Sequence, residues 1–387
     1  MKSYPIFLLT SFILSTNLAA SPNVTISGTI PGAIKLNAKA SQVTVIKPIT
    51  LQKINFSKAA KTYLANHVKS LNIKHAYTTT TLPSNVNLGM ENVPVLNQGE
   101  WGSCVTFAIT GSIDALLKKG DYISQLCNLE LGAYLESIDE EHDSGWNGSD
   151  HETVLGQIQK YGVITMETQK TQGCGSERKI YEYPLHRHDD KGAPMTIADF
   201  SRFAEPMNHQ VYWKSLLNFN NAFSKRAHED NVVMNVKLAL ANGHRVVIEH
   251  VLDVNGELFQ YLGAMGNYQT DHDTWVVTEQ VKEDIRKLND DNVPDEEKPL
   301  FGGHAMIITG FNDHAIAIEK TNDGQVEHKG IFTIRNSVTG LAGDRGTFYM
   351  SYDYFKLLNG GAIEISSTPF TVSHQSSNKN NFEKMKD

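Results

Sequence analysis

Apolar and polar residues alternate in the first part of the chain. Val24-Thr25-Ile26 and Val43-Thr44-Val45-Ile46 follow the period of two that is typical of half-buried strands, and Pro31-Gly32 supplies turn-forming residues. The pattern changes at Ser57, because serine is a preferred N-cap and the residues after it share one helical face. That face holds Ala60, Leu64, His67, Val68 and Leu71. The pattern therefore predicts a β-hairpin followed by one amphipathic helix.

Cys104 opens the most strongly patterned helix of the chain. One apolar stripe, which we expect to be buried, recurs every three or four residues, at Val105, Ala108, Ile109, Ser112, Ile113, Leu116 and Leu117. Lys118 and Lys119 suit the negative end of the helix dipole, and Gly120 is expected to stop the helix. The pattern thus places Cys104 at a helix N-terminus.

Helices give way to strands after about residue 230. The last clear helix before this point opens with Ser149-Asp150-His151-Glu152, a capping box with Ser149 as the cap, and ends at Gly162. Three short apolar runs are then typical of buried strands: Arg245 to Leu252, Ala305 to Phe311 and Gly330 to Asn336. The charged segment from Glu279 to Lys298 is interpreted as a solvated loop. A helical part followed by a β part predicts an α+β fold.

The N-terminus is typical of an exported protein. Lys2 and the apolar run from Ile6 to Leu14 resemble a signal peptide over residues 1–20, with cleavage predicted after Ala20. No later stretch approaches the roughly 20 apolar residues of a membrane helix. We therefore expect a secreted protein, periplasmic or extracellular, without a membrane partner. A possible glycosylation sequon at Asn147, within the expected substrate groove, favours a bacterial source.

The threonine run from Thr78 to Thr81, followed by Pro83, is typical of an exposed linker that proteases cut readily. We place a prosegment at residues 21–81 and the main domain at residues 82–387. Within it we expect a mainly helical lobe (82–225), a mainly β lobe (226–372) and a polar tail (373–387). The alternative is a small N-terminal module that stays attached.

Composition removes some classes of function. The chain has 387 residues, of which 40% are hydrophobic and 20% charged, as in an ordinary globular protein. A net charge of −8 and the lack of a long basic run argue against a nucleic-acid partner. The chain has three cysteines, so an exported protein of this kind keeps at least one thiol outside an internal disulfide.

Cys104 has the surroundings that a nucleophilic thiol needs. A helix N-terminus and a nearby imidazolium both favour the thiolate. Gln98, in the glycine-containing loop before Cys104, can aim its amide at an oxyanion beside the Cys104 N–H. His304 follows two glycines at the start of an apolar strand, and Asn336 ends another strand. These positions suit a base and the residue that orients its ring.

The segments around these residues resemble the motifs of papain-like cysteine peptidases. Leu96 to Ala108 resembles the Gln-Gly-x-Cys-Gly-Ser-Cys-Trp-x-Phe nucleophile motif, and Gly303 to Met306 resembles the histidine strand. Asn336 to Gly346 follows the Asn-Ser-Trp-Gly-x-x-Trp-Gly-x-x-Gly loop in register. Gly145 to Ser149 is similar to the Gly-Cys-x-Gly-Gly segment that binds the substrate backbone, and Leu82-Pro83-Ser84 to the mature start. The motifs keep the family's order over most of residues 82–360.

This resemblance implies a papain-like two-lobed fold, with Cys104 on a helical lobe facing His304 and Asn336 on a β-barrel-like lobe. It implies a thiolate–imidazolium pair, an acyl-enzyme and an oxyanion stabilised by Gln98, with neither cofactor nor metal. The expected partners are a protein or peptide substrate and the prosegment itself, lying across the groove as an inhibitor. The residues expected to contact substrate are Gly102, Ser103, Gly148, Ser149 and Gly303.

The chain also departs from the family pattern. Trp101 and Trp146 replace both ends of a usual disulfide, so we expect the indoles to fill that space by packing. Cys127 and Cys174 remain to pair with each other, which the sequence alone leaves open.

The asparagine loop departs as well. Val338 and Ala342 replace both of its tryptophans. Either the His304–Asn336 hydrogen bond is wetter than usual, or Trp101 shields it from elsewhere.

Two other functions stay open on the sequence alone. The missing loop tryptophans favour a catalytically silent binding protein, whereas joint retention of Gln98, Cys104, His304 and Asn336 argues against it. A thiol acyl transferase or amidase would use the same residues and depend on an added amine. Residues 186–190, His-Arg-His-Asp-Asp, have metal-ligand types but no second half-site at standard spacing, so we expect no metal there.

Overall fold

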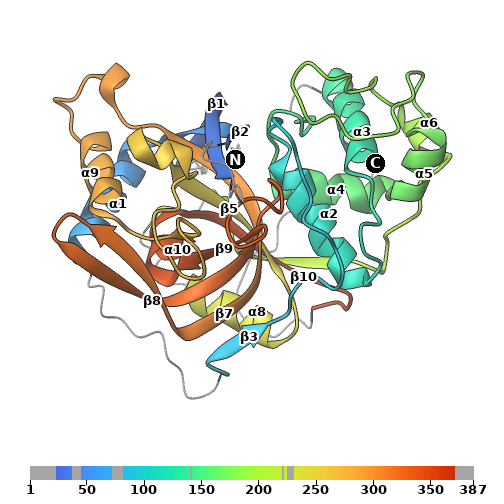
Figure 1. Cartoon of the computed structure of the whole chain (residues 1–387). Coiled ribbons are helices and arrows are strands. Elements are labelled where there is room, and N and C mark those ends of the chain that lie inside the picture. Colours follow the sequence, from blue (N-terminus) through green and yellow to red (C-terminus); the bar gives the residue numbers. More distant parts are fainter. Residues whose placement is uncertain are drawn as a thin grey trace, which may run out of the picture.

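The computed structural model describes residues 23–36, 45–71, 82–139, 142–219, 222–224 and 231–370. The expected signal peptide, the threonine run and the polar tail lie outside the described residues. Figure 1 shows two lobes side by side, one made of helices and the other built around a sheet. The protein is therefore a two-lobed α+β structure, as the sequence predicts.

The helical lobe is arranged around α2. Its helices are α2 (Cys104–Leu117), α3 (Gln125–Ile138), α4 (His151–Tyr161), α5 (Met166–Gln172) and α6 (Ile197–Ser201). Helix α2 contacts α3 and α4 within this lobe, and β5 and β7 of the other. It is buried on every side from its first residue to Ala115, so the predicted buried stripe is confirmed as far as Ile113, and the burial extends beyond it. A helix at a lobe junction has partners all round, and its pattern shows only the most apolar side.

Two predicted helix ends are shifted. The structure ends α2 at Leu117, where Lys118 adopts a left-handed conformation with φ of 58°, before Gly120 is reached. Helix α4 is capped by Asp150 instead of Ser149, because the Asp150 carboxylate accepts from the N–H of Thr153 at 2.9 Å and from its hydroxyl at 2.7 Å. Ser149 is therefore not the helix cap, and its backbone serves another contact.

The β lobe is organised on one sheet. Its strands are β3 (Asn85–Asn87), β4 (Tyr212–Leu217), β5 (Val246–Asp253), β6 (Thr274–Trp275), β7 (Phe301–Thr321), β8 (Gly324–Arg335), β9 (Thr347–Ser351) and β10 (Asn359–Ser366). The path runs β4-β10-β5-β7-β8-β9-β6, and β3 also pairs with β7. The three predicted strands are confirmed within β5, β7 and β8. Strand β7 is central, and it carries His304.

Helices and short 3-10 turns cover this sheet. They are α8 (Val232–Ala241), η2 (Gly256–Gln260), α9 (Glu279–Leu288), η3 (Asp295–Glu297) and α10 (Tyr352–Leu358). The interpretation of Glu279–Lys298 as a solvated loop was wrong for its first half. Helix α9 is capped by Thr278 and buries Val281, Ile285 and Leu288. Its charges dominate the composition, but the apolar spacing of three and four residues forms a helix.

The N-terminal hairpin and helix are confirmed as β1 (Val24–Leu36), β2 (Val45–Phe56) and α1 (Lys58–Ser70). The hydroxyl of Ser57 caps α1 by accepting from the Ala60 N–H. Pro31-Gly32, by contrast, lies inside β1 and pairs with Thr50 and Ile49. The connection between β1 and β2 lies outside the described residues.

This N-terminal segment packs into the β lobe. Strand β2 pairs antiparallel with β7, where Gln52 faces Gly303 and Ile54 faces Phe301. Helix α1 contacts α9 and α10. Three fully buried side chains of the N-terminal segment belong to the main core of the β lobe: Leu51 of β2, and Ala60 and Leu64 of α1. In Figure 1 the blue β1 and β2 lie between the two lobes.

Candidate active site

Cys104 is the first residue of α2 and lies at the junction of the lobes. It is a free thiol, with only 2% of the residue exposed. The hydroxyl of the preceding residue, Ser103, hydrogen-bonds the phenol of Tyr183 at 2.9 Å and does not cap the helix. Its sulfur lies 4.0 Å from the carbonyl oxygen of Gly102, and Cys104 shares a core cluster with Ala305, the residue after His304 in β7. The thiol is thus held between α2 and β7.

The structure brings His304 and Asn336 together. Nε2 of His304 lies 2.9 Å from Oδ1 of Asn336, and both residues are buried. An amide oxygen only accepts, so Nε2 carries the proton of the neutral ring. Nδ1 is then an acceptor, and it has no hydrogen-bond partner among the described residues. This is the tautomer that a base for a neighbouring thiol requires.

Burial favours the neutral forms of the Cys104 thiol and the His304 ring in this structure. It raises the pKa of the Cys104 thiol to about 11. Burial also lowers the pKa of His304 to about 4, although the hydrogen bond to Asn336 acts in the opposite direction. Desolvation disfavours the charged form of either group. In this structure desolvation therefore works against the ion pair that the resemblance implies.

Gln98 is fully buried beside these residues. Its Nε2 donates to the carbonyl of Trp101 at 2.8 Å, and its Oε1 accepts from the Ser337 hydroxyl at 2.7 Å. The two contacts fix which way the amide points and leave one of its two N–H groups for a further acceptor. They also tie the loop before Cys104 to the residue after Asn336.

The two tryptophans that stand in place of the family's cysteines pack against each other, as expected. Trp101 and Trp146 are 4.9 Å apart in edge-to-face contact, and the Trp101 indole N–H donates to the carbonyl of Pro184 at 3.0 Å. Cys127 and Cys174 form a disulfide between α3 and the residues after α5.

Tyr183 is a supporting residue that sequence reasoning did not single out. It stacks on Trp146, and its hydroxyl donates to the Gln98 carbonyl at 3.2 Å, so it braces the loop before Cys104. Burial raises its pKa. A sequence signal that could have found it is the aromatic-proline stretch Tyr181-Glu182-Tyr183-Pro184.

The asparagine loop is buried even though it lacks the two tryptophans of the family motif. Val338 and Ala342 are fully buried in the β-lobe core, and Asn336 is only 1% exposed. The His304–Asn336 hydrogen bond is therefore shielded in this state. Part of the cover comes from the N-terminal segment, since Lys47 Nζ donates to the Val338 carbonyl at 2.8 Å.

Strand β2 lies in the groove between the lobes. The side chain of Gln52 donates to the Ser149 carbonyl at 3.3 Å, and its backbone pairs with Gly303. Gly148 has a φ of +133°, and a Cβ there would lie 2.3 Å from Gln52 Nε2. Of the residues assigned to substrate, Gly148, Ser149 and Gly303 thus contact the protein's own strand. Gly102 instead donates its N–H to the Trp146 carbonyl at 2.9 Å.

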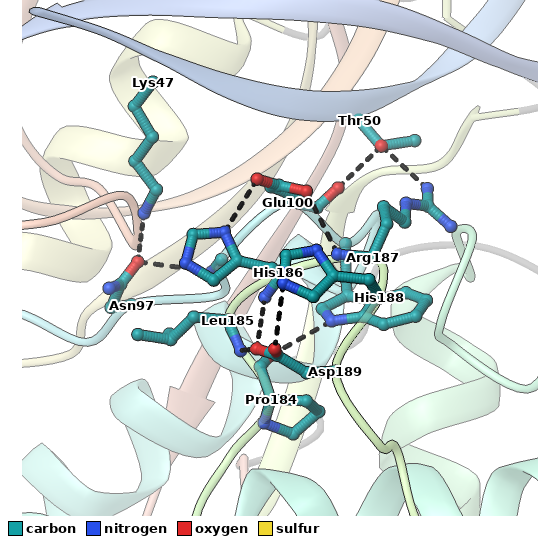
Figure 2. A network of polar contacts seen from close by, with 12 residues as sticks. Lys47, Thr50, Asn97, Glu100, Pro184, Leu185, His186, Arg187, His188 and Asp189 are labelled. Carbon is teal, nitrogen blue, oxygen red and sulfur yellow. Dashed lines mark hydrogen bonds and ion pairs between the residues drawn. The ribbon is translucent and has the colours of Figure 1, made fainter.

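Figure 2 shows a polar network that holds β2 in the groove. Thr50 donates to the Glu100 carbonyl at 2.7 Å and accepts from Arg187 at 2.7 Å. The Glu100 carboxylate accepts from the His186 ring at 2.9 Å and from the Arg187 N–H at 3.0 Å. Lys47 donates to the side chain of Asn97. We call these residues the latch: Lys47, Thr50, Asn97, Glu100, His186 and Arg187.

The charges of the latch reinforce one another. The hydrogen bond from His186 lowers the pKa of Glu100, and the same bond raises the pKa of His186. Desolvation lowers the pKa of Lys47 to about 8, against the attraction of Glu100. The His-Arg-His-Asp-Asp segment therefore serves hydrogen bonding here. Over the described part of the chain, no three His, Cys, Asp or Glu residues are grouped to hold a metal.

Comparisons with known proteins give partial structural matches at low sequence identity. No protein-family model and no curated protein matches the chain. Xylellain, a cysteine protease from Xylella fastidiosa, is similar at 19% identity with a TM-score of 0.43, over 77% of this chain and 94% of that one. Digestive procathepsin L 3 of Tenebrio molitor larval midgut is similar at 13% identity with a TM-score of 0.40, over 79% of each chain. The recombinant stem bromelain precursor is similar at 14% identity with a TM-score of 0.41, over 75% of this chain and 71% of that one.

The chain's own features carry the fold assignment. Its motifs stand in the papain-like order, and its helical lobe begins its central helix at Cys104. Its β lobe carries the hydrogen-bonded His304 and Asn336. No helix within the described ranges is long and apolar enough to cross a bilayer. The chain therefore has the two-lobed fold of the papain-like cysteine peptidases.

Proposed function

We propose that this protein is a secreted cysteine endopeptidase made as a precursor. The observation that carries the proposal is the extended strand β2 in the groove, in contact with Ser149 and Gly303 beside the catalytic pair. A groove that binds its own chain in extended form, by backbone pairing and by contact with a carbonyl, suits a peptide substrate. Cys104, His304, Asn336 and Gln98 supply the groups for acyl transfer.

The chemistry proceeds in two halves. Cys104 gives its proton to Nδ1 of His304, and the thiolate attacks the carbonyl carbon of the peptide bond. The resulting oxyanion accepts from Gln98 and from the Cys104 N–H. His304 then protonates the leaving amine, which leaves a thioester on Cys104. Water attacks the thioester with His304 as the base, releasing the acid and restoring the thiol.

In the same proposal β2 is the inhibitor of the precursor. It occupies the contacts that a substrate needs, and in its presence Cys104 and His304 are both buried. Leu51, Phe56 and Leu64 complete the β-lobe core, which favours the alternative that the N-terminal module stays attached. Cleavage of the linker alone would then leave the segment bound. Activity requires β2 to leave the groove.

The test is hydrolysis of a mixed peptide library in thiol buffer. The full-length protein and an Arg187→Ala variant, in which the latch is weakened, are each compared with a Cys104→Ala control. Cleavage that disappears in the control supports the peptidase. The peptidase proposal is contradicted if neither the full-length protein nor Arg187→Ala cleaves any peptide and Cys104 alkylates no faster than a free thiol at neutral pH. That outcome favours a silent binding protein. Product that forms only when an amine is added indicates an acyl transferase.

A further inference from the structure

A cavity of about 290 Å³ lies directly beside His304. It is bounded by His304 and Ala305 of β7, by Val105 next to the nucleophile and by Ser149 of the substrate segment. In the proposed peptidase, a side chain of a peptide in the groove would enter this cavity, and its lining residues would decide which side chain is accepted there.

The lining combines apolar walls with acidic groups. Val105, Phe219 and Ala305 provide apolar surface from the two lobes. The carboxylates of the lining are Asp150, Glu152 and Glu249. Its histidines are His151, His250 and His304, and burial lowers the pKa of His250 and of His304, which favours their neutral forms. No lysine or arginine is among the described residues that line the cavity. Even with His151 protonated, three carboxylates face one positive ring, so the cavity is negative.

Glu249 is the carboxylate with free capacity. Its Oε1 accepts from the His151 N–H at 2.8 Å and lies 2.9 Å from Nδ1 of the same residue. Oε2 has no hydrogen-bond partner in the described part of the chain, and the side chain is 12% exposed. Asp150 is committed to capping α4, and Glu152 accepts from Asn218 at 3.2 Å.

A second observation points to a missing ligand. His151 lines the cavity and is only 3% exposed, yet its Nε2 has no hydrogen-bond partner among the described residues. The lining residues that the hairpin contributes, Ile26, Gln52 and Ile54, leave this ring nitrogen without a partner.

We propose that this cavity selects a basic side chain, arginine or lysine, at one substrate position beside the scissile bond, with Glu249 as the residue that determines the choice. The apolar walls match the methylene stem of such a side chain, and the carboxylate matches its charged head. The proposal rests on the peptidase function and adds its substrate class.

The test compares peptides within one reaction, because the ratio of their cleavage rates does not depend on how much of the enzyme is open. Acetylated peptides carry arginine, lysine, leucine, glutamine or glutamate at each of the three residues before the cleaved bond. We expect arginine or lysine to exceed leucine by about tenfold or more at one position. Glu249→Gln lowers that ratio toward one.

The matched control is Glu364→Gln, which removes a carboxylate paired with His244 at 2.6 Å outside the cavity. Its ratio should equal that of the wild type. Peptide cleavage without a basic preference, or a preference that survives Glu249→Gln, overturns this proposal and leaves the peptidase standing.

A second readout does not need catalysis. Agmatine, a guanidinium on an aliphatic stem, should raise the melting temperature of Cys104→Ala and fail to raise that of the Cys104→Ala, Glu249→Gln double variant. Failure of peptide hydrolysis with agmatine binding intact would overturn the peptidase alone. No stabilisation by agmatine at millimolar concentration overturns the basic cavity.

Discussion

Replacing Arg187 with alanine is expected to open the groove without touching the catalytic residues. Its guanidinium donates to Thr50 of β2 at 2.7 Å and to Asn147 of the helical lobe at 2.9 Å, and stacks 4.7 Å from the Trp101 ring. It is one of the latch side chains that join β2 to the helical lobe directly. Its backbone N–H, which binds Glu100, is retained in the variant.

The size of the effect follows from the lost contact. A hydrogen bond to a charged group contributes about 1.5–3 kcal/mol when it is well protected. Arg187 is exposed, so solvent screening reduces this to about 1 kcal/mol. About 1.4 kcal/mol corresponds to a factor of ten. The open population, meaning the molecules in which β2 has left the groove, should therefore rise by roughly fivefold to tenfold.

The assay is the rate at which iodoacetamide modifies Cys104 in the full-length protein at fixed pH. When opening and closing are fast compared with alkylation, this rate follows the open population. Cys127 and Cys174 are bonded to each other, so Cys104 is the reporting thiol. Peptide cleavage should rise by the same factor, because both require β2 to move.

The matched control is Arg178→Ala. Arg178 pairs with Asp190 at the surface of the same region and makes no described contact with β2. If Arg187→Ala and Arg178→Ala are alkylated at the same rate, the latch is not what holds β2. A double-mutant cycle with Thr50→Val adds a second test, since the two changes should not be additive when they remove one interaction.

Three further predictions address the rest of the molecule. Because burial raises the pKa of Cys104 to about 11, its alkylation rate in the full-length protein should rise about tenfold per pH unit up to that value. A plateau near pH 8.5 would indicate an ordinary exposed thiol instead. Leu64→Ala, in the fully buried face of α1, should lower the free energy of unfolding by about 2–5 kcal/mol in urea titrations, whereas Lys61→Ala on the same helix should change it little. An equal, small effect of both would mean that the N-terminal segment is not part of the core. Asn336→Ala leaves the Nε2–H of His304 buried without an acceptor, so kcat should fall with little change in KM, and Asn336→Gln should restore part of it. A purely structural role would lower stability and leave the kcat of the folded fraction intact.

The sequence by itself determined the local elements and the candidate reactive residues. Helical spacing from Cys104 to Leu117, the capping serine before α1 and the alternation in β1 and β2 depend on neighbours within a few residues. Such patterns are set by backbone periodicity and can be read without knowing the fold. The order of the motifs also indicated that Cys104, His304, Asn336 and Gln98 belong to one site.

Only the tertiary structure decided how these pieces affect one another. That β2 lies in the groove depends on contacts such as Lys47 with Val338, 291 residues apart, and Gln52 with Ser149, 97 apart. The cavity carboxylate Glu249 meets His151 across 98 residues. No local periodicity encodes these pairs, because they arise when two lobes and a strand from elsewhere exclude water together. The same exclusion of water sets the pKa of Cys104 and keeps the thiol neutral.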